Sequence, residues 1–314
     1  MSSILLPDRL FSSHPEERAI ARELYAAVAT LPIVSPHGHT DPRWFADNAP
    51  FANATELLLQ PDHYLLRMLY SQGISLDTLG IARSDGSTAG ADPAAVWQLF
   101  GDHYHLFHGT PTRLWMDHIL AEVFAIDARL DSASAADIYV EINRQLATPA
   151  FLPRALFERF NIEVLATTES PLDPLAAHQR LAQDPWPGRV ITTFRPDPVV
   201  DPEYEGFADN IAELARISGV SCDSYAGYLD ALRERRAFFK SLGATATDHG
   251  HPSAHTADLS PAECARLYHG ALAGTLEAHE AEQFRGQLLL EMALMSLDDG
   301  LVMQLHPGVY RNHN

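Results

Sequence analysis

The chain has 314 residues, of which 46% are hydrophobic and 20% are charged, as is usual for a folded globular protein. Its formal net charge of −19 makes nucleic acid and anionic membrane surfaces poor partners, and any bound anion requires local positive charge. No long apolar run suggests a membrane span, and the acidic first thirty residues are unlike a signal peptide, so we expect a cytoplasmic protein.

The first half of the chain predicts one short strand among helices. Ser13 is a plausible cap for a helix that residues 14–17 open, which predicts a helix over 14–30. The apolar run 31–34 predicts a strand. A second helix is expected over 62–72, where Gly73 would end it. Further helices are expected over 94–107, 112–123, 134–146 and 153–160. We interpret residues 73–160 as a helical insertion after the first strand.

Beyond residue 160, predicted strands and helices alternate. Apolar and β-branched runs predict strands over 162–168, 189–194, 244–247 and 301–305. Helices are expected between them over 174–183, 207–218, 224–242, 261–269 and 276–297. This alternation is typical of parallel sheets joined by right-handed crossovers. The sequence thus predicts an α/β fold in which residues 1–72 begin a β/α barrel, 73–160 form the insertion and 161–314 carry strands two to five.

A pair of histidines, His37 and His39, follows the first predicted strand. Side chains two residues apart in an extended segment point to the same side, so both imidazoles can reach one ion. Imidazole binds zinc, iron, nickel and copper. The alternative is a polar loop in which Gly38 only makes a turn.

The other predicted strands also end in polar or ionisable groups. Thr168 and Glu169 end the second strand, and Arg195 and Asp197 the third. The fourth ends in Thr247-Asp248-His249 and the fifth in His306, with Arg311 beyond it. In β/α barrels the catalytic groups lie at the C-terminal ends of the strands. The pattern therefore predicts an enzyme.

In order along the chain, these motifs resemble the uronate isomerase (glucuronate isomerase) family of the amidohydrolase superfamily. The resemblance rests on residues 36–39, 60–64, 193–197, 247–250 and 303–308 with Arg311-Asn312. It implies a (β/α)8 metal-dependent hydrolase-like TIM barrel with a helical insertion after strand 1. It also implies aldose–ketose isomerisation of D-glucuronate to D-fructuronate and of D-galacturonate to D-tagaturonate.

The resemblance also implies roles for individual histidines and a tyrosine. His37, His39 and His306 would bind a divalent metal, commonly zinc, although His306 could instead bond a loop carbonyl. His63 and Tyr64 would begin a helix and face the substrate as catalytic groups. A tyrosine can donate a proton or polarise an oxygen. The alternative for Tyr64 is packing against the barrel.

The substrate implied by the resemblance is an anion, and the protein is acidic. Arg195 is expected to bind its carboxylate, because a guanidinium pairs bidentately with carboxylates. A structural pair with Asp197 is the alternative. Arg311 is a second substrate-binding candidate, unless it lies in a solvated loop. Asp248 is a candidate catalytic carboxylate and His249 a substrate-binding residue that could orient it, with a turn role for Asp248 left open.

The reaction and the length of the chain leave further alternatives. Isomerisation requires a proton to leave C2 and another to reach C1, although a hydride shift is a competing route. A complete barrel has about eight strands, whereas five are predicted here, and the strand-eight aspartate of the family is not among these residues. The expectation is that the isolated chain is inactive or poorly soluble. The alternatives are a non-catalytic truncated product and another metal-dependent amidohydrolase; a homo-oligomer stays open.

Overall fold

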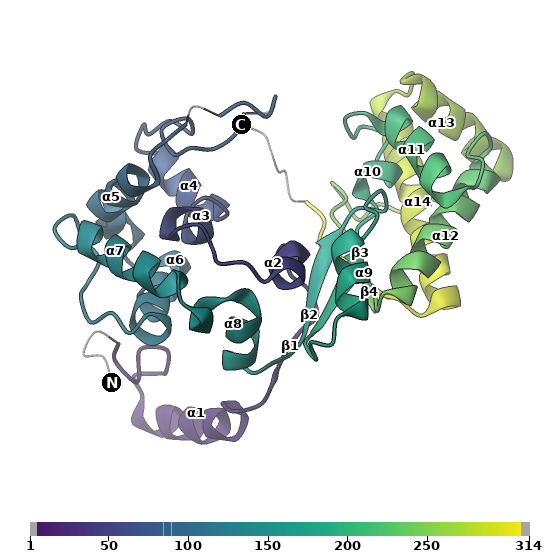
Figure 1. Cartoon of the computed structure of the whole chain (residues 1–314). Helices are drawn as coiled ribbons and strands as arrows, with labels where there is room; N and C mark the ends of the chain where they lie inside the picture. The colour runs from purple at the N-terminus through teal and green to yellow at the C-terminus, as the bar shows by residue number, and fades with distance from the viewer. Residues whose placement is uncertain (1–4, 84, 89, 309–314) are drawn as a thin grey trace. The chain divides into compact units, whose positions relative to one another are not determined.

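The computed structural model describes residues 5–83, 85–88 and 90–308 of the chain (Figure 1). The chain forms two compact units. The helical unit comprises Met1–Leu31 and Asn48–Phe160, and the sheet unit comprises Pro32–Asp47 and Asn161–Asn314. The predicted division into residues 1–72, 73–160 and 161–314 stays a prediction.

The helical unit contains the predicted helices and a short one that the sequence analysis did not anticipate, α3. Its helices are α1 (Pro15–Val28), α3 (Ala54–Leu58), α4 (His63–Tyr70), α5 (Pro93–His103), α6 (Pro111–His118), α7 (Ala135–Leu146) and α8 (Pro153–Arg159). A 3-10 turn follows α5 at Tyr104–Phe107, a π turn follows α6 at Ile119–Val123, and a 3-10 turn at Pro149–Phe151 precedes α8. Expected helices 94–107 and 112–123 therefore each end in a different helical geometry.

An aromatic core holds the helical unit together. Trp97, Phe100 and Tyr104 are fully buried along one side of α5 and its following turn. The indole N–H of Trp97 donates to the carbonyl of Ala135, 3.0 Å away, at the start of α7. Gly101 lets the two helices approach, because a Cβ there would lie 2.5 Å from that of Ala135. This unit therefore has a core of its own.

Among its described residues, the sheet unit contains five parallel strands in the order β1-β2-β3-β4-β5. They are β1 (Ile33–Ser35), β2 (Ile162–Glu169), β3 (Arg189–Phe194), β4 (Ala246–His249) and β5 (Val302–Leu305). The strand count and the parallel arrangement confirm the predicted α/β class. The fourth strand begins and ends two residues later than predicted, since Asp248 and His249 pair with Gln304 and Leu305 of β5.

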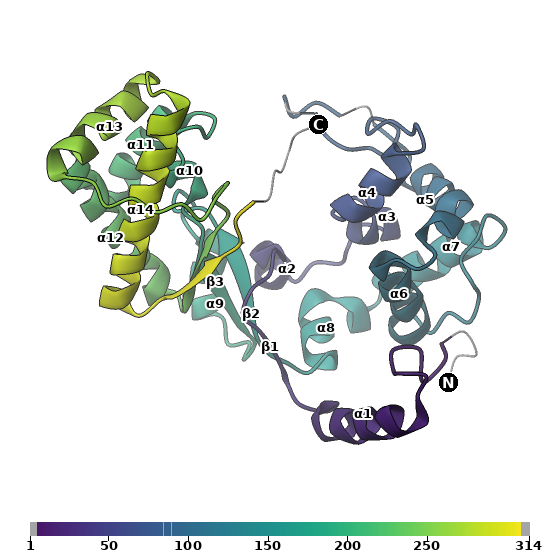
Figure 2. The ribbon, with the colours of Figure 1, turned by 180° about the vertical axis from the view of Figure 1, so that it is seen from behind.

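The helices of this unit are α2 (Pro42–Asp47), α9 (Ala176–Gln183), α10 (Asp197–Val200), α11 (Phe207–Ser218), α12 (Tyr225–Ser241), α13 (Pro261–Ala273) and α14 (Ala278–Asp299). Helices α9 and α12 pack on β3 and α14 packs on β5, while α13 packs on α11, α12 and α14. Helices α11 to α14 gather beside the sheet, and the view from behind brings α14 to the front (Figure 2). No helix among the described residues is both long and apolar enough to cross a membrane.

Side-chain alternation along the strands separates a helix-facing layer from the opposite face. Phe194 packs on Phe239 of α12 with ring centroids 5.1 Å apart, and Thr167 Oγ1 lies 2.9 Å from His178 Nε2 of α9. Successive side chains of a strand point to opposite faces. Thr168 and Asp248 therefore face away from these helices, on the side where the candidate site forms.

The end strands of the sheet expose apolar side chains. Ile33 of β1 is 49% exposed and Val302 of β5 is 66% exposed. Apolar strands at a sheet edge favour association with other strands. The expected poor solubility of the isolated chain is consistent with this exposure and stays a prediction.

Candidate active site at the strand ends

The histidine pair converges just beyond β1. The Nε2 atoms of His37 and His39 lie 3.3 Å apart, as the spacing predicts. Close packing explains the glycine at position 38, because a Cβ there would lie 3.0 Å from the carbonyl oxygen of Ala166 in β2. The hydroxyl of Thr168 donates to the Gly38 carbonyl over 2.8 Å. A residue without a side chain thus lets the loop lie against β2 and present both imidazoles.

Asp248 completes a group that fits a metal ion. One ligand atom each from His37, His39 and Asp248 lies within 4.8 Å of the others. Asp248 is fully buried. The Nδ1 atom of His37 is buried without a hydrogen-bond partner among the described residues. Two imidazole nitrogens and a carboxylate oxygen are a donor set that divalent transition metals accept.

His306 lies on the far side of the same carboxylate. Its Nδ1 is 2.9 Å from Asp248 Oδ1, and its ring centroid is 6.1 Å from that of His37. Its Nε2 is buried without a hydrogen-bond partner in the described part of the chain. The structure therefore brings together all three predicted metal ligands, with Asp248 between His37 and His306.

Arg195 reaches the cluster from the end of β3. Its Nε donates to Asp197 Oδ2 over 2.8 Å, and its Nη1 donates to Asp248 Oδ2 over 3.2 Å. The structural pair with Asp197 and a place in the site are thus both present. Asp197 also accepts a hydrogen bond from the backbone N–H of Gly250, 3.0 Å away. From the sequence, Asp197 was only an alternative partner of Arg195, and its link to Gly250 was not predicted.

His249 lies on the other face of β4, away from Asp248. Its ring is fully buried, and its Nε2 lies 2.8 Å from Thr247 Oγ1. Burial, followed by the proximity of His251, lowers the pKa of His249 to about 3. The structure thus places a neutral imidazole among the helix-facing side chains. A substrate-binding role for His249 stays a prediction.

His63 and Tyr64 belong to the helical unit, in the first turn of α4. The side chain of Asp62 caps this helix by accepting from the backbone N–H groups of Tyr64 and Leu65, at 2.9 and 3.2 Å. Tyr64 is 59% exposed, and the guanidinium of Arg67 lies 5.0 Å from its ring centroid. Catalytic roles for His63 and Tyr64 stay predictions. Arg311 lies outside the described residues.

A second buried polar cluster lies between the sheet and α9. Glu169, at the end of β2, accepts a hydrogen bond from Thr192 Oγ1, and its Oε2 lies 3.9 Å from His178 Nε2. Burial raises the pKa of Glu169 to about 7. In the sequence, this cluster was indicated only by Glu169, a charged residue at the end of an otherwise apolar predicted strand. Glu169 faces the helices, so it is separate from the His37 cluster.

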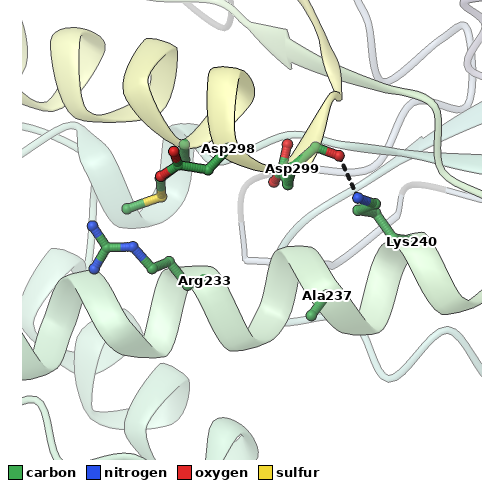
Figure 3. Close-up of a pocket in the computed structure, with 6 residues that line it drawn as sticks. Arg233, Ala237, Lys240, Asp298 and Asp299 are labelled. Carbon is green, nitrogen blue, oxygen red and sulfur yellow. Dashed lines mark hydrogen bonds between the residues drawn. The ribbon is translucent and has the colours of Figure 1, made fainter.

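A cavity of about 330 Å³ lies between α12 and α14 (Figure 3). It is lined by Arg233, Ala237, Lys240, Met295, Asp298 and Asp299. The ammonium of Lys240 donates to the backbone carbonyl of Asp299 across the cavity. The cavity lies on the helix side of the sheet unit, so it does not contribute to the strand-end site.

Comparison with known proteins shows which family the chain resembles over most of its length. A sequence model of the glucuronate isomerase family matches residues 11–314. The chain belongs to the glucuronate isomerase family. This match confirms the family resemblance carried by the HxH pair and the later strand-end motifs.

Two curated relatives named uronate isomerase illustrate how far the similarity extends. The protein of Xanthomonas axonopodis pv. citri is 62% identical over 310 residues, covering 99% of this chain and 66% of the relative. The protein of Rhizorhabdus wittichii is 59% identical over 310 residues, and the match covers 65% of its length. The chain therefore spans just under two thirds of the length of these relatives.

Solved structures of the family share the fold. The crystal structure of glucuronate isomerase from Caulobacter crescentus matches with a TM-score of 0.95 and 52% identity, covering 99% of this chain and 64% of that one. A uronate isomerase from Thermotoga maritima matches with a TM-score of 0.89 at 24% identity, which shows the fold alone. The predicted fold class is confirmed by the Caulobacter match.

Proposed function

We propose that the strand-end cluster is the uronate site of an aldose–ketose isomerase. The reaction would convert D-glucuronate to D-fructuronate and D-galacturonate to D-tagaturonate. The observation that carries this proposal is the guanidinium of Arg195, placed beside the His37, His39 and Asp248 group in a chain of net charge −19. The relatives named uronate isomerase support it. A cytoplasmic location belongs to the same proposal.

Arg195 would bind the carboxylate of the sugar acid. Guanidinium and carboxylate form short, charge-assisted hydrogen bonds. The side chain of Arg195 is 19% exposed, so its partner would bind in a partly desolvated place where such bonds are stronger. The net charge of the protein repels anions at long range, which makes a local cation necessary.

A divalent cation, with zinc as the leading candidate, would be held by His37, His39 and Asp248. When bound, it would supply a Lewis acid that polarises a sugar oxygen. The family resemblance implied His306 as the third ligand, and Asp248 was a candidate catalytic carboxylate. The geometry supports the reverse, because Asp248 belongs to the three-residue group of described residues that could hold an ion and His306 does not.

His306 would then take part in proton exchange. Isomerisation needs a group that removes the C2 proton and a group that delivers one to C1. The imidazole of His306 can hold a proton on either nitrogen, and its Nδ1 lies 2.9 Å from the Asp248 carboxylate. The Asp248 carboxylate would orient the ring. A hydride shift is the competing route.

Metal affinity separates the two ligand assignments. In Asp248→Asn we expect the affinity for Zn²⁺ to fall by about tenfold or more, whereas His306→Asn should stay near the wild-type value. Competition against a chromophoric chelator measures both. His279→Asn is a matched control, because His279 is 68% exposed on α14. A large loss in His306→Asn with none in Asp248→Asn would restore the original assignment.

Binding and turnover of D-glucuronate test the proposed function. Calorimetry on the Zn²⁺-loaded chain should show binding of D-glucuronate that Arg195→Gln weakens by about tenfold or more, with little binding of neutral D-glucose. Ketose formation followed by NMR tests the separate expectation that the isolated chain is inactive. Absence of uronate binding, together with hydrolysis of an amide or ester, would favour another amidohydrolase activity instead.

A further inference from the structure

We propose that Asp197 is a positioning residue that sets the direction of the Arg195 guanidinium, and that Gly250 provides the space this guanidinium occupies. The inference rests on the proposed function, because it concerns how the uronate carboxylate is recognised. It adds two residues to the site that were not among the predicted functional residues. Neither would need to touch the substrate.

Both carboxylate oxygens of Asp197 are engaged, each by a different strand end. Oδ2 accepts from Arg195 Nε at 2.8 Å, beyond β3, and Oδ1 accepts from the Gly250 backbone N–H at 3.0 Å, beyond β4. The Asp197 side chain is only 15% exposed, so water competes weakly for either bond. Asp197 therefore links the ends of two neighbouring strands through one partly buried carboxylate.

This arrangement decides which nitrogens of Arg195 are available. Its Nε–H is committed to Asp197, and its Nη1 reaches Asp248 Oδ2 at 3.2 Å. The Nη end of the guanidinium thus points into the cluster, where a ligand carboxylate could bind. Without Asp197, the flexible side chain of Arg195 would lose the hydrogen bond from Nε that fixes the plane of its guanidinium. Arg195 would then be free to pair more closely with Asp248, which neutralises both groups.

Gly250 is required for space. A Cβ at position 250 would lie 2.5 Å from Arg195 Nη2 and 2.9 Å from Asp197 Oδ2. Even an alanine would therefore press on the guanidinium and on the carboxylate that holds it. The glycine and the aspartate act on the same group, so changing either should produce the same defect.

The test compares Asp197→Asn and Gly250→Ala with the wild-type chain, all loaded with Zn²⁺. Asparagine keeps an acceptor for the Gly250 N–H but removes the charge that holds Arg195. Calorimetry should show a loss of about tenfold or more in affinity for D-glucuronate in both variants, with Zn²⁺ affinity and the urea unfolding midpoint near wild type. Asp201→Asn is the matched control. The Asp201 carboxylate lies 2.9 Å from Arg285 Nη1 and takes no part in the cluster. Its D-glucuronate affinity should stay within about twofold of wild type.

The outcomes separate this inference from the proposed function. If the wild-type chain binds no D-glucuronate, the proposed function fails. If it binds, and both variants bind with wild-type affinity, the positioning role is overturned. Loss of Zn²⁺ affinity alongside uronate affinity in both variants would show a general structural role, which also overturns it. If one variant does not fold, the other decides the question on the same readouts.

Discussion

At the scale of single residues, burial decides which charged groups of the sheet unit are available for chemistry. Asp248 is fully buried yet lies near three nitrogen-bearing side chains, those of His37, Arg195 and His306. A buried carboxylate is tolerated when such partners stabilise its charge. Glu169 is also buried, but its partners are a hydroxyl and an imidazole rather than a permanent cation. The burial of Glu169 is therefore not offset by a permanent positive charge.

Glu169→Gln tests the effect of this burial on stability. The pKa of Glu169 is raised from 4.5 to about 7, so the folded state binds the proton more tightly than the unfolded state. The protonated form contributes stability below pH 4.5, and that contribution is lost as pH rises through about 7. Relative to wild type, Glu169→Gln should gain up to about 3 kcal/mol in unfolding free energy between pH 5 and pH 8.

Urea unfolding at several pH values measures this difference. Glu163→Gln is the matched control, because Glu163 lies on the same strand with an exposed side chain. The unfolding free energies of Glu163→Gln and wild type should change with pH in the same way over this range. If Glu169→Gln also ran parallel to wild type, Glu169 would titrate alike in the folded and unfolded states.

At the scale of elements, the ends of helices and strands position the predicted functional side chains. The strand ends of β1, β3, β4 and β5 bring their side chains to one cluster because parallel strands end at the same edge. In the helical unit, the N-terminal cap of α4 positions His63 and Tyr64. Asp62 accepts from two backbone N–H groups and so holds the first turn, which carries His63 and Tyr64.

Asp62→Ala should loosen this turn. Loss of a side-chain N-cap destabilises a helix end by about 1 kcal/mol. We expect faster hydrogen exchange at the amides of Tyr64 and Leu65, which lose their acceptor, and a similar loss in unfolding free energy. Asp62→Asn should preserve most of the protection, because asparagine is also a good N-cap. Unchanged exchange at both amides in Asp62→Ala would contradict the capping role.

At the scale of the whole molecule, the net charge of −19 opposes the anionic substrate that the site is proposed to bind. The Debye length falls from about 30 Å at 0.01 M salt to about 8 Å at 0.15 M. Moderate salt should therefore screen the distant acidic groups more than it weakens the close contact with Arg195.

Affinity for D-glucuronate should accordingly rise between about 0.01 M and 0.15 M NaCl, by a few-fold. Calorimetry at constant pH and Zn²⁺ concentration measures this rise. The neutral sugar D-glucose, whose weak binding should not change with salt, is the control. A steady fall in D-glucuronate affinity over this range would mean that the local ion pair outweighs the field of the whole protein.

Much of the fold was predictable because its signals are local. Period-two and period-3.6 patterns located the strands and most helices, and the bounds of β3 and α11 agree with the predicted ranges. The short helices α2, α3 and α10 were missed, because four to six residues carry too little periodicity. The end of β4 was also misplaced, since its last two residues are polar and are defined by pairing with β5.

The sequence by itself determined the family, the parallel α/β class and the side chains that end each strand, because these depend on residue order and periodicity. Only the tertiary structure decided which of those side chains meet. It placed Asp248 between His37, His306 and Arg195, turned His249 to the opposite face, and joined Asp197 to Gly250. The physical reason is that strand register and close packing between residues more than fifty positions apart set these contacts, and neither is encoded in a local pattern.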